Sequence, residues 1–420
     1  MNSSPNAGHL SGARLPAWLL PLDWPQVDGQ PVLADLECLA GRVHQVRPHN
    51  PSAPQGLALH GQLVLPGLLA AHAHLDKTYT RSRLGTLKPG LLAAIAATRS
   101  DQEHWTEEDL SRRAGQALAD ACSQGVTSLR THLDWQCENA PTSWEVLKRL
   151  SREWKPHLRV ECSALVPLRL YADRELGSRI AQQVAVTDGA CLGAFIHSSN
   201  YDVQAVSNLL QIACDFGLNL DLHVDEELSE SACGLSDIAD LAVSLNFSQR
   251  IVCSHACALS VQEPLRALNI LDRVAQAPIT LVSLPSTNLL LQDAQPDRTP
   301  RFRGITLLKE ARERNIPVLL AGDNVRDAFC PLGNYDPLEA LSLGVLTGQL
   351  DGIFDDWSQS ICRLDWLHTP QAQPSLVGEV ADLTVFATVD IDSWPAVTTR
   401  TLIRRGEIPG SLPDFFEEQS

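Results

Sequence analysis

The chain has 420 residues, of which 44% are hydrophobic and 20% charged, which is typical of a globular protein with one large domain and a smaller one. Fifty acidic residues against 33 basic ones give a net charge of −17, which argues against nucleic acid or an anionic membrane as a partner. There is no apolar run of about eighteen residues, so we expect no membrane span. Met1–Pro5 lacks the basic start of a signal peptide, and the eleven cysteines form no Cys-X-X-Cys pair, so we expect a cytoplasmic protein.

Short apolar runs alternate with turn residues near both ends of the chain. Between residues 15 and 65 the runs are separated by turn pairs such as Trp24-Pro25, which is typical of small β-hairpins. Comparable runs return after residue 378. We therefore expect residues 15–65 and 371–410 to form one small β-sandwich domain from both chain ends.

Eight β-prone runs follow in the middle of the chain, separated by stretches such as Leu110–Ser123 whose apolar residues recur at helical spacing. The runs lie at residues 63–74, 127–134, 158–166, 191–197, 218–225, 250–256, 278–285 and 317–323. Eight strand–helix units predict the α/β class and a (β/α)8 TIM-like barrel over residues 66–370. A doubly wound open sheet is the alternative, but no run is followed by the Gly-rich phosphate turn that such a sheet needs.

The run at residues 65–77 has an apolar start and ends in two histidines. Its sequence is Leu-Pro-Gly-Leu-Leu-Ala-Ala-His-Ala-His-Leu-Asp-Lys. Because side chains alternate along a strand, His72 and His74 point to the same side, where two nitrogen donors form half of a metal site. A pair of ordinary half-buried histidines is the alternative. We expect Lys77 either to contact substrate or anchor the loop, or to be a plain surface lysine.

Three further polar residues lie at the ends of predicted strands, the end at which a (β/α)8 barrel builds its active site. They are His223 in the fifth run, His255 in the sixth and Asp323 in the eighth. Neutral imidazoles with one carboxylate suit Zn2+ or Fe2+ better than Ca2+ or Mg2+. The strand ends therefore predict a site for a divalent metal ion, either Zn2+ or Fe2+.

Several short segments of the chain together carry a family pattern. They are His72-Ala73-His74-Leu75-Asp76, Arg130-Thr131-His132-Leu133-Asp134, His223-Val224-Asp225-Glu226, Ser254-His255, Arg303-Gly304-Ile305-Thr306 and Gly322-Asp323-Asn324-Val325. With them the chain resembles the cytosine deaminase branch of the metal-dependent amidohydrolases, from Leu65 to about Gly344.

This resemblance implies a ligand set and two catalytic roles. By it, His72, His74, His223 and Asp323 hold a single divalent metal ion. His255 would lie beside the metal-bound water, and Glu226 would be the proton shuttle. Binuclear relatives need a bridging carboxylate, often a carboxylated lysine on the fourth strand; the fourth run here has no lysine, which favours one ion.

The chemistry of the residues supports these roles. A divalent metal lowers the pKa of its bound water, and Asp323 beside it can accept the water's proton. Glu226 lies three residues past His223, where a loop carboxyl can protonate a ring nitrogen and later the leaving amine. A solvated loop acid is the alternative for Glu226. His255 can stabilise the hydroxide or oxyanion by a charge-assisted hydrogen bond.

Three substrate-facing positions depart from the cytosine deaminase pattern. Leu168 stands where a glutamine usually binds the amide edge of the pyrimidine, and a polar edge left unpaired there costs about 1–3 kcal/mol. Asn324 replaces a second aspartate, and a neutral amide would contact a different ring edge. The fourth strand ends in His-Ser-Ser-Asn at 197–200 instead of an aromatic-acidic stretch. These differences leave the substrate open.

Three more residues are candidates for substrate contact. His132 and His197 lie at the active ends of the second and fourth strands, although hydrogen bonds that support other site residues explain them equally well. Phe329 follows the eighth strand and could stack on a planar heterocycle. Simple packing is the alternative for Phe329.

We therefore expect a metal-dependent hydrolase that removes an exocyclic amine from a nitrogen heterocycle, such as a cytosine-like pyrimidine or a related purine or triazine. Hydrolysis of a cyclic or linear non-peptide amide by the same site is the alternative. A non-catalytic metal-binding barrel is a remoter one. The expected partners are a small heterocyclic substrate and further copies of the chain in a homo-oligomer, as is common in the family.

Overall fold

The structure is a computed structural model that describes residues 8–52, 56–368 and 373–407. Met1–Pro5 and the limits 371 and 410 of the predicted small domain lie outside the described residues. The chain forms two compact units. Unit 1 comprises residues 1–68, 350–362 and 371–420, and unit 2 comprises residues 69–349 and 363–370.

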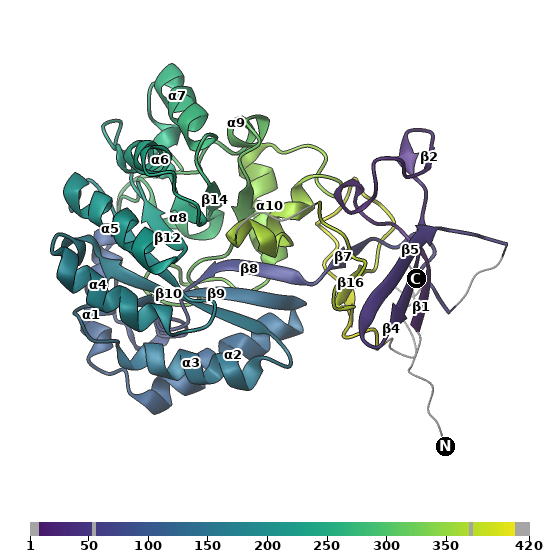
Figure 1. The fold of residues 1–420 in the computed structure, drawn as a ribbon, viewed down its shortest axis with the longest axis horizontal. Helices are drawn as coiled ribbons and strands as arrows, with labels where there is room; N and C mark the ends of the chain where they lie inside the picture. Colours follow the sequence, from purple (N-terminus) through teal and green to yellow (C-terminus); the bar gives the residue numbers. More distant parts are fainter. Residues whose placement is uncertain (1–7, 53–55, 369–372, 408–420) are drawn as a thin grey trace. The chain divides into compact units, whose positions relative to one another are not determined.

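The main sheet has eight strands, each paired with the next along the chain (Figure 1). They are β8 (Leu68–Ala73), β9 (Val126–Asp134), β10 (Arg159–Pro167), β11 (Cys191–Ile196), β12 (Leu220–Val224), β13 (Ile251–His255), β14 (Ile279–Ser283) and β15 (Val318–Leu320). The first and last strands meet through a parallel bridge between Ala73 and Asp323, where the Asp323 amide donates to the His72 carbonyl at 3.2 Å. The predicted (β/α)8 barrel is confirmed.

Helices alternate with these strands and surround the barrel (Figure 1). They are α1 (Leu91–Gln102), α2 (Glu107–Ser123), α3 (Thr142–Trp154), α4 (Arg174–Ala185), α5 (Val203–Phe216), α6 (Gly234–Ser244), α7 (Pro264–Val274), α8 (Pro285–Leu291), α9 (Leu308–Glu313) and α10 (Pro337–Gly348). Within the described ranges, no helix is long and apolar enough to cross a lipid bilayer.

Helix α2 shows how the sequence determines these elements. Thr106 caps its start by accepting from the Asp109 amide at 3.2 Å, and three acidic residues in the first turn complement the helix dipole. Leu110, Ala114 and Ala117 recur at helical spacing and are fully buried. The predicted helix over Leu110–Ser123 is therefore confirmed, and it begins one turn earlier.

The predicted first strand, 63–74, is two strands in the structure. Residues Val64–Pro66 form β7, which pairs antiparallel with β16 (Leu383–Phe386) in unit 1, and β8 begins two residues later in the barrel. Pro66 still pairs with Leu383 and the Gly67 amide donates to the Asp382 carbonyl at 2.9 Å, so the apolar run changes its partner strand after residue 67. The apolar pattern is continuous, which is why the sequence alone predicts one strand.

Unit 1 contains two sheets around a shared core. One sheet has the order β5-β4-β1-β6 and the other the order β17-β16-β7. The further strands are β1 (Gly8–Ala13), β4 (Ala34–Leu39), β5 (Arg42–Pro48), β6 (Leu57–Ala58) and β17 (Arg400–Ile403), beside a small β2–β3 pair (Gln26–Val27 and Gln30–Pro31). Leu10 and Leu36 from one sheet pack in the same buried cluster as Leu383 and Ile403 from the other. This arrangement is the predicted β-sandwich.

Residues 350–362 belong to unit 1, whereas the predicted barrel domain includes them. An ion pair ties this segment to the residue that follows β1, because Asp355 Oδ2 lies 2.7 Å from Arg14 Nη2. The Ala17 amide donates to Asp355 Oδ1 at 2.8 Å, and Trp18 Nε1 donates to Ser358 Oγ at 2.8 Å. These contacts join residues far apart in the sequence, so no local pattern predicts them.

A layer of buried charges lies inside the barrel. The Arg130 guanidinium on β9 contacts Glu161 Oε2 at 2.8 Å and Asp221 Oδ2 at 3.0 Å. The second oxygen of Asp221 lies 2.9 Å from His132 Nε2. All four side chains are buried, and Arg130 compensates both carboxylates, with a second arginine, Arg159, 2.7 Å from Glu161 Oε1. This layer supports the site described below, because the His132 ring stacks on His72 with a centroid distance of 3.8 Å.

Replacing Arg130 by methionine should destabilise the protein strongly, because Asp221 loses its guanidinium partner and Glu161 is left with Arg159, whose side chain is half-exposed. Breaking a buried ion pair from one side costs about 3–5 kcal/mol, which chemical denaturation measures. The control is Arg112→Met, since the Arg112 side chain is 70% exposed beside Asp109 and should contribute less than about 1 kcal/mol. An equally small loss in both variants would contradict a supporting role for the buried layer.

Candidate metal centre and active site

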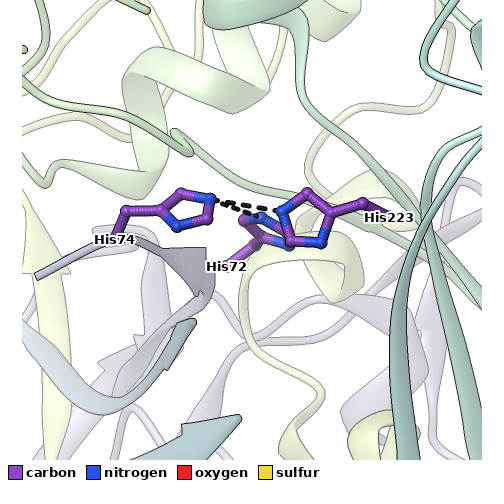
Figure 2. Close-up of side chains that lie close together, drawn as sticks. All are labelled: His72, His74 and His223. Atoms are coloured by element: carbon purple, nitrogen blue, oxygen red, sulfur yellow. Dashed lines mark hydrogen bonds between the residues drawn. The ribbon is translucent and has the colours of Figure 1, made fainter. Parts of the chain in front are cut away.

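Three histidines converge on one point at the active end of the barrel (Figure 2). His72 lies on β8, His74 follows β8 directly, and His223 lies on β12. The Nε2 atom of His74 is 3.3 Å from Nε2 of His72 and 3.3 Å from Nε2 of His223. Asp323, which follows β15, places its Oδ1 atom 3.1 Å from His74 Nε2 and 3.4 Å from His72 Nε2.

This donor set fits a divalent cation. A tetrahedral centre with metal–nitrogen bonds of about 2.0–2.1 Å separates its ligand atoms by about 3.3 Å, which is the distance from His74 Nε2 to the Nε2 atoms of His72 and His223. Asp323 Oδ1 is buried and has no hydrogen-bond donor among the described residues. Burial lowers the pKa of His72 and of His74 to about 3, which keeps both imidazoles neutral and able to bind a metal ion.

The ring of His72 is oriented by a hydroxyl group on a neighbouring strand. Its Nδ1 atom lies 2.9 Å from Ser254 Oγ on β13. The hydroxyl can accept the Nδ1 proton, which leaves Nε2 as the free donor atom. His132 packs against the face of the same ring. The hydrogen bond from Ser254 and the stacked ring of His132 together fix the orientation of the His72 imidazole.

Four residues at the active end have left-handed backbone conformations, with φ of +50° at Asp225, +72° at His255, +46° at Ala256 and +66° at Asp323. Such conformations are costly for residues other than glycine and persist only where the surroundings enforce them. Hydrogen bonds between neighbouring strand ends do so here, since the Asp225 amide donates to the Ile196 carbonyl at 2.9 Å. The strand ends thus turn sharply and direct polar side chains to one point.

Glu226 and His255 lie together beside the cluster. Glu226 Oε1 is 3.4 Å from His255 Nδ1, and both side chains are buried. Burial, with the charge of Asp323, raises the pKa of Glu226 well above its ordinary value. Burial lowers the pKa of His255 to about 3. Asn288 Nδ2, on α8, is 3.1 Å from the same His255 nitrogen and helps to fix that ring.

A cavity of about 360 Å³ opens onto these groups. Eight residues expected at the site from the sequence line it: His74, His223, Glu226, His255, Asp323, Leu168, Asn324 and Phe329. One wall is apolar and comes from α1, through residues such as Leu91 and Ile95. The cavity therefore combines a metal-binding set, a buried acid and an apolar wall, which suits a planar organic substrate.

Comparison with known proteins agrees with this geometry. The Amidohydrolase family model matches residues 84–353. A pterin deaminase from Rhizobium rhizogenes is 32% identical over 428 residues, which cover 99% of this chain and 97% of that protein. This chain belongs to the amidohydrolase family. As a member, this amidohydrolase is a metal-dependent enzyme that hydrolyses C–N bonds other than peptide bonds, and the expected family membership is confirmed.

Solved structures share the fold of this amidohydrolase. The structure of 5-methylcytosine deaminase from Klebsiella pneumoniae with 5-fluorocytosine has a TM-score of 0.79 at 20% identity, covering 95% of this chain and 96% of that one. N-isopropylammelide isopropylaminohydrolase from Burkholderia multivorans has a TM-score of 0.72 at 20% identity, covering 96% and 97%. At these identities the likeness shows the architecture of a barrel with an attached small sheet domain.

Two of the candidate substrate residues are not among the residues that line the cavity. His132 lies in the buried charged layer against Asp221. His197 places its Nδ1 atom 2.9 Å from Ser199 Oγ and stacks on Phe195. Both positions favour the supporting role that the sequence left open for these histidines.

Lys77 of the amidohydrolase is buried in the cavity wall, so the surface-lysine alternative is wrong. Its Nζ atom is 2.8 Å from Asp134 Oδ1, 3.1 Å from His74 Nδ1 and 5.5 Å from the Phe329 ring centroid. Burial opposes its charge, but Asp134 and Asp76 hold the pKa of Lys77 above its ordinary value. Lys77 thus joins the loop after β8 to the end of β9.

The sequence did not point to several residues of this site. Gln136 and Trp135 line the cavity from the loop after β9, whereas Ser199 and Asn200, which line it after β11, belong to the 197–200 stretch that the sequence did single out. Asn288 contacts His255 from a helix. None of these residues stands in a motif, and a position just after a strand end was the single signal available for the loop residues.

We expect the purified amidohydrolase to contain about one divalent metal ion per chain. His74→Ala should lose most of this metal, because it removes the imidazole whose Nε2 contacts all three other donor atoms. Elemental analysis of the dialysed protein measures the content. His197→Ala, outside the cavity lining, is the matched control and should keep the ion. Two ions per chain, or equal content in both variants, would contradict this ligand set.

Proposed function

We propose that this amidohydrolase is a hydrolytic deaminase that removes the exocyclic amine of a pteridine-type heterocycle. The observation that carries the proposal is the shared cavity, in which a buried acid, Glu226, faces the same space as His74, His223 and Asp323. A metal-activated water and a proton donor beside one substrate are what hydrolysis of an amine on an aromatic ring requires.

The proposed ligands of the metal ion are His72, His74, His223 and Asp323. Three neutral imidazoles and one carboxylate accept either Zn2+ or Fe2+. When bound there, such an ion supplies an activated water at neutral pH. No lysine on β11 offers a bridge to a second ion, so we propose a single metal ion per site.

Two carboxyl groups then move the protons. With Oδ1 of Asp323 among the metal-binding atoms, the carboxylate would use its other oxygen to accept a proton from the water that attacks the amine-bearing ring carbon. Glu226, with its raised pKa, would protonate the adjacent ring nitrogen. It would then take up the proton that leaves the new hydroxyl group and deliver it to the departing amine, and the proton held by Asp323 would restore Glu226. His255 lies beside Glu226 and can stabilise charge on the attacking oxygen. The balance is one water consumed, one C–N bond broken, one C–O bond formed and one ammonia released.

A bicyclic substrate is supported by the relative and by the cavity. The relative that is 32% identical over nearly the whole chain is a pterin deaminase. Leu168 and the α1 residues offer apolar surface where a pyrimidine-specific site would offer an amide. Phe329, on the opposite loop, can stack on a flat ring. The residues that depart from the cytosine deaminase pattern thus favour a larger, flatter substrate.

Release of an alkylamine is the second candidate reaction. The Burkholderia multivorans protein of the same fold is an N-isopropylammelide isopropylaminohydrolase. The two reactions differ only in the leaving group, so the same metal ion and the same acid would catalyse both.

A homo-oligomer and a cytoplasmic location, both expected from the sequence, stay predictions.

A screen of aminopteridines, aminopurines, aminopyrimidines and aminotriazines should show ammonia release that is fastest with an aminopteridine. Coupled ammonia detection measures the rate, and mass spectrometry identifies whether oxygen has replaced the amine. Isopropylamine release from an alkylamino-triazine would favour the second candidate. Ring opening without ammonia would contradict deamination.

Glu226→Gln should keep the metal ion and the fold but lose about 10²–10⁴-fold in kcat, because an amide of the same shape cannot transfer the proton. Steady-state kinetics, elemental analysis and the melting temperature together measure this outcome. Glu227→Gln is the matched control, since Glu227 contacts Ser198 and is not among the cavity-lining residues. Normal turnover in Glu226→Gln would overturn the assigned role.

A further inference from the structure

The loop that follows Asp323 is built around one buried carboxyl group, that of Asp327. Asp327 Oδ1 accepts from the amides of Phe329 at 2.8 Å and Cys330 at 3.1 Å. Its Oδ2 atom accepts from Asn324 Nδ2 at 2.6 Å. The side chain has no exposed surface, so each oxygen has a fixed set of donors. The carboxyl therefore holds both the loop and one side chain of the cavity wall.

That side chain, Asn324, presents an acceptor to the cavity. An ionised carboxylate can only accept hydrogen bonds, so Asn324 must offer its NH2 group to Asp327. The amide oxygen, Oδ1, is then the end turned away from Asp327. No donor from the described part of the chain contacts Asn324 Oδ1, while the residue lines the cavity. A donor on the substrate would satisfy this oxygen.

We propose that Asp327 is a positioning residue that fixes the amide of Asn324 with its oxygen toward the cavity, and that Asn324 thereby selects an aminated ring with an N–H beside the carbon that loses its amine. The inference rests on the proposed deaminase function and adds to it the donor pattern of the substrate. Asn324 directly follows Asp323 and lines the same cavity as His74 and Glu226, so a substrate held there for deamination would lie within its reach.

This donor pattern separates two classes of ring of nearly equal shape. In a 2-amino-4-oxo ring such as pterin, the nitrogen between the amine-bearing carbon and the carbonyl carries a hydrogen. In 2,4-diaminopteridine the same nitrogen has a lone pair, which would face the lone pairs of Asn324 Oδ1. A site built to hydrogen-bond a substrate N–H rejects an analogue without it, because its own polar group is left unpaired. The class we infer is therefore the 2-amino-4-oxo ring.

The test compares the affinities of pterin and 2,4-diaminopteridine, read from their fluorescence on metal-loaded protein. Glu226→Gln is the background, so that neither ring is turned over. Burial raises the pKa of Asp327 to about 7. The hydrogen bonds from Asn324 and the two loop amides, with the charge of Lys77, lower the pKa and so oppose this effect. Titrations at about pH 7.5 keep most of Asp327 ionised while most of the pterin keeps its ring N–H. We expect pterin to bind at least about tenfold more tightly.

Asp327→Asn should reverse this preference. Asparagine at 327 keeps its oxygen for the amides of Phe329 and Cys330 and so offers NH2 to Asn324. Asn324 must then turn its oxygen toward residue 327 and present its NH2 group to the cavity. The ratio of pterin affinity to 2,4-diaminopteridine affinity should fall from at least about ten to below one. A purely structural role of Asp327 would instead weaken both ligands equally and leave the ratio unchanged.

Asp35→Asn is the matched control, because Asp35 in unit 1 also accepts from two backbone amides, those of Gly12 at 2.9 Å and Asn50 at 3.1 Å. With Asp35→Asn added to Glu226→Gln, the ratio of pterin affinity to 2,4-diaminopteridine affinity should equal that of Glu226→Gln alone. If Asp327→Asn fails to fold, Asn324→Ala tests the inference instead. In that variant the two ligands should bind with nearly equal affinity. An unchanged ratio in these site variants, or no preference for pterin in the background, overturns the inference.

The outcome is distinguishable from a failure of the proposed function. Ammonia release from pterin by the unaltered enzyme tests deamination alone. Release of ammonia with an unchanged ratio in Asp327→Asn would overturn the role of Asp327 and leave the deaminase standing. A reversed ratio without any ammonia release would support the donor pattern and contradict deamination.

Discussion

The meeting of the first and last barrel strands is the constraint on which the site depends. Ala73 and Asp323 form a parallel bridge, and the Asp323 amide donates to the carbonyl of His72. Residues from opposite ends of the barrel sequence thereby share one point in space, and the carboxylate arrives between two imidazoles. If the barrel did not close, β8 and β15 would be the two opposite edges of an open sheet. Asp323 would then lie far from His72 and His74, and the four residues could not bind one ion.

Burial gives this meeting point its chemistry. Imidazoles removed from water stay neutral and bind a cation, whereas an acid removed from water keeps its proton, so the same physical cause prepares the ligands and Glu226 for different tasks. Desolvated carboxylates elsewhere are compensated by amide donors, as at Asp327, or by a fixed cation. Arg130 serves Glu161 and Asp221 below the site. Buried charge is thus concentrated where structure provides a partner for it.

Local patterns predicted much of this. Alternation in the first strand and the rule that barrels act at their strand ends placed His72, His74, His223 and Asp323 near one another, because both features depend on neighbours in sequence. The apolar wall of α1, the contact of Asn288 with His255 and the burial of Lys77 beside Asp134 depend on how separate elements pack. No period or motif encodes those distances, so they required the structure.

The bridge between Ala73 and Asp323 also has a meaning for the order in which the protein matures. The ribosome makes the two histidines of the first strand early and the carboxylate after the eighth strand late. A growing chain therefore holds an incomplete set of donors until nearly the whole barrel has emerged. An ion can therefore bind all four donors only after the barrel has closed. Metal uptake would thus indicate that closure is complete.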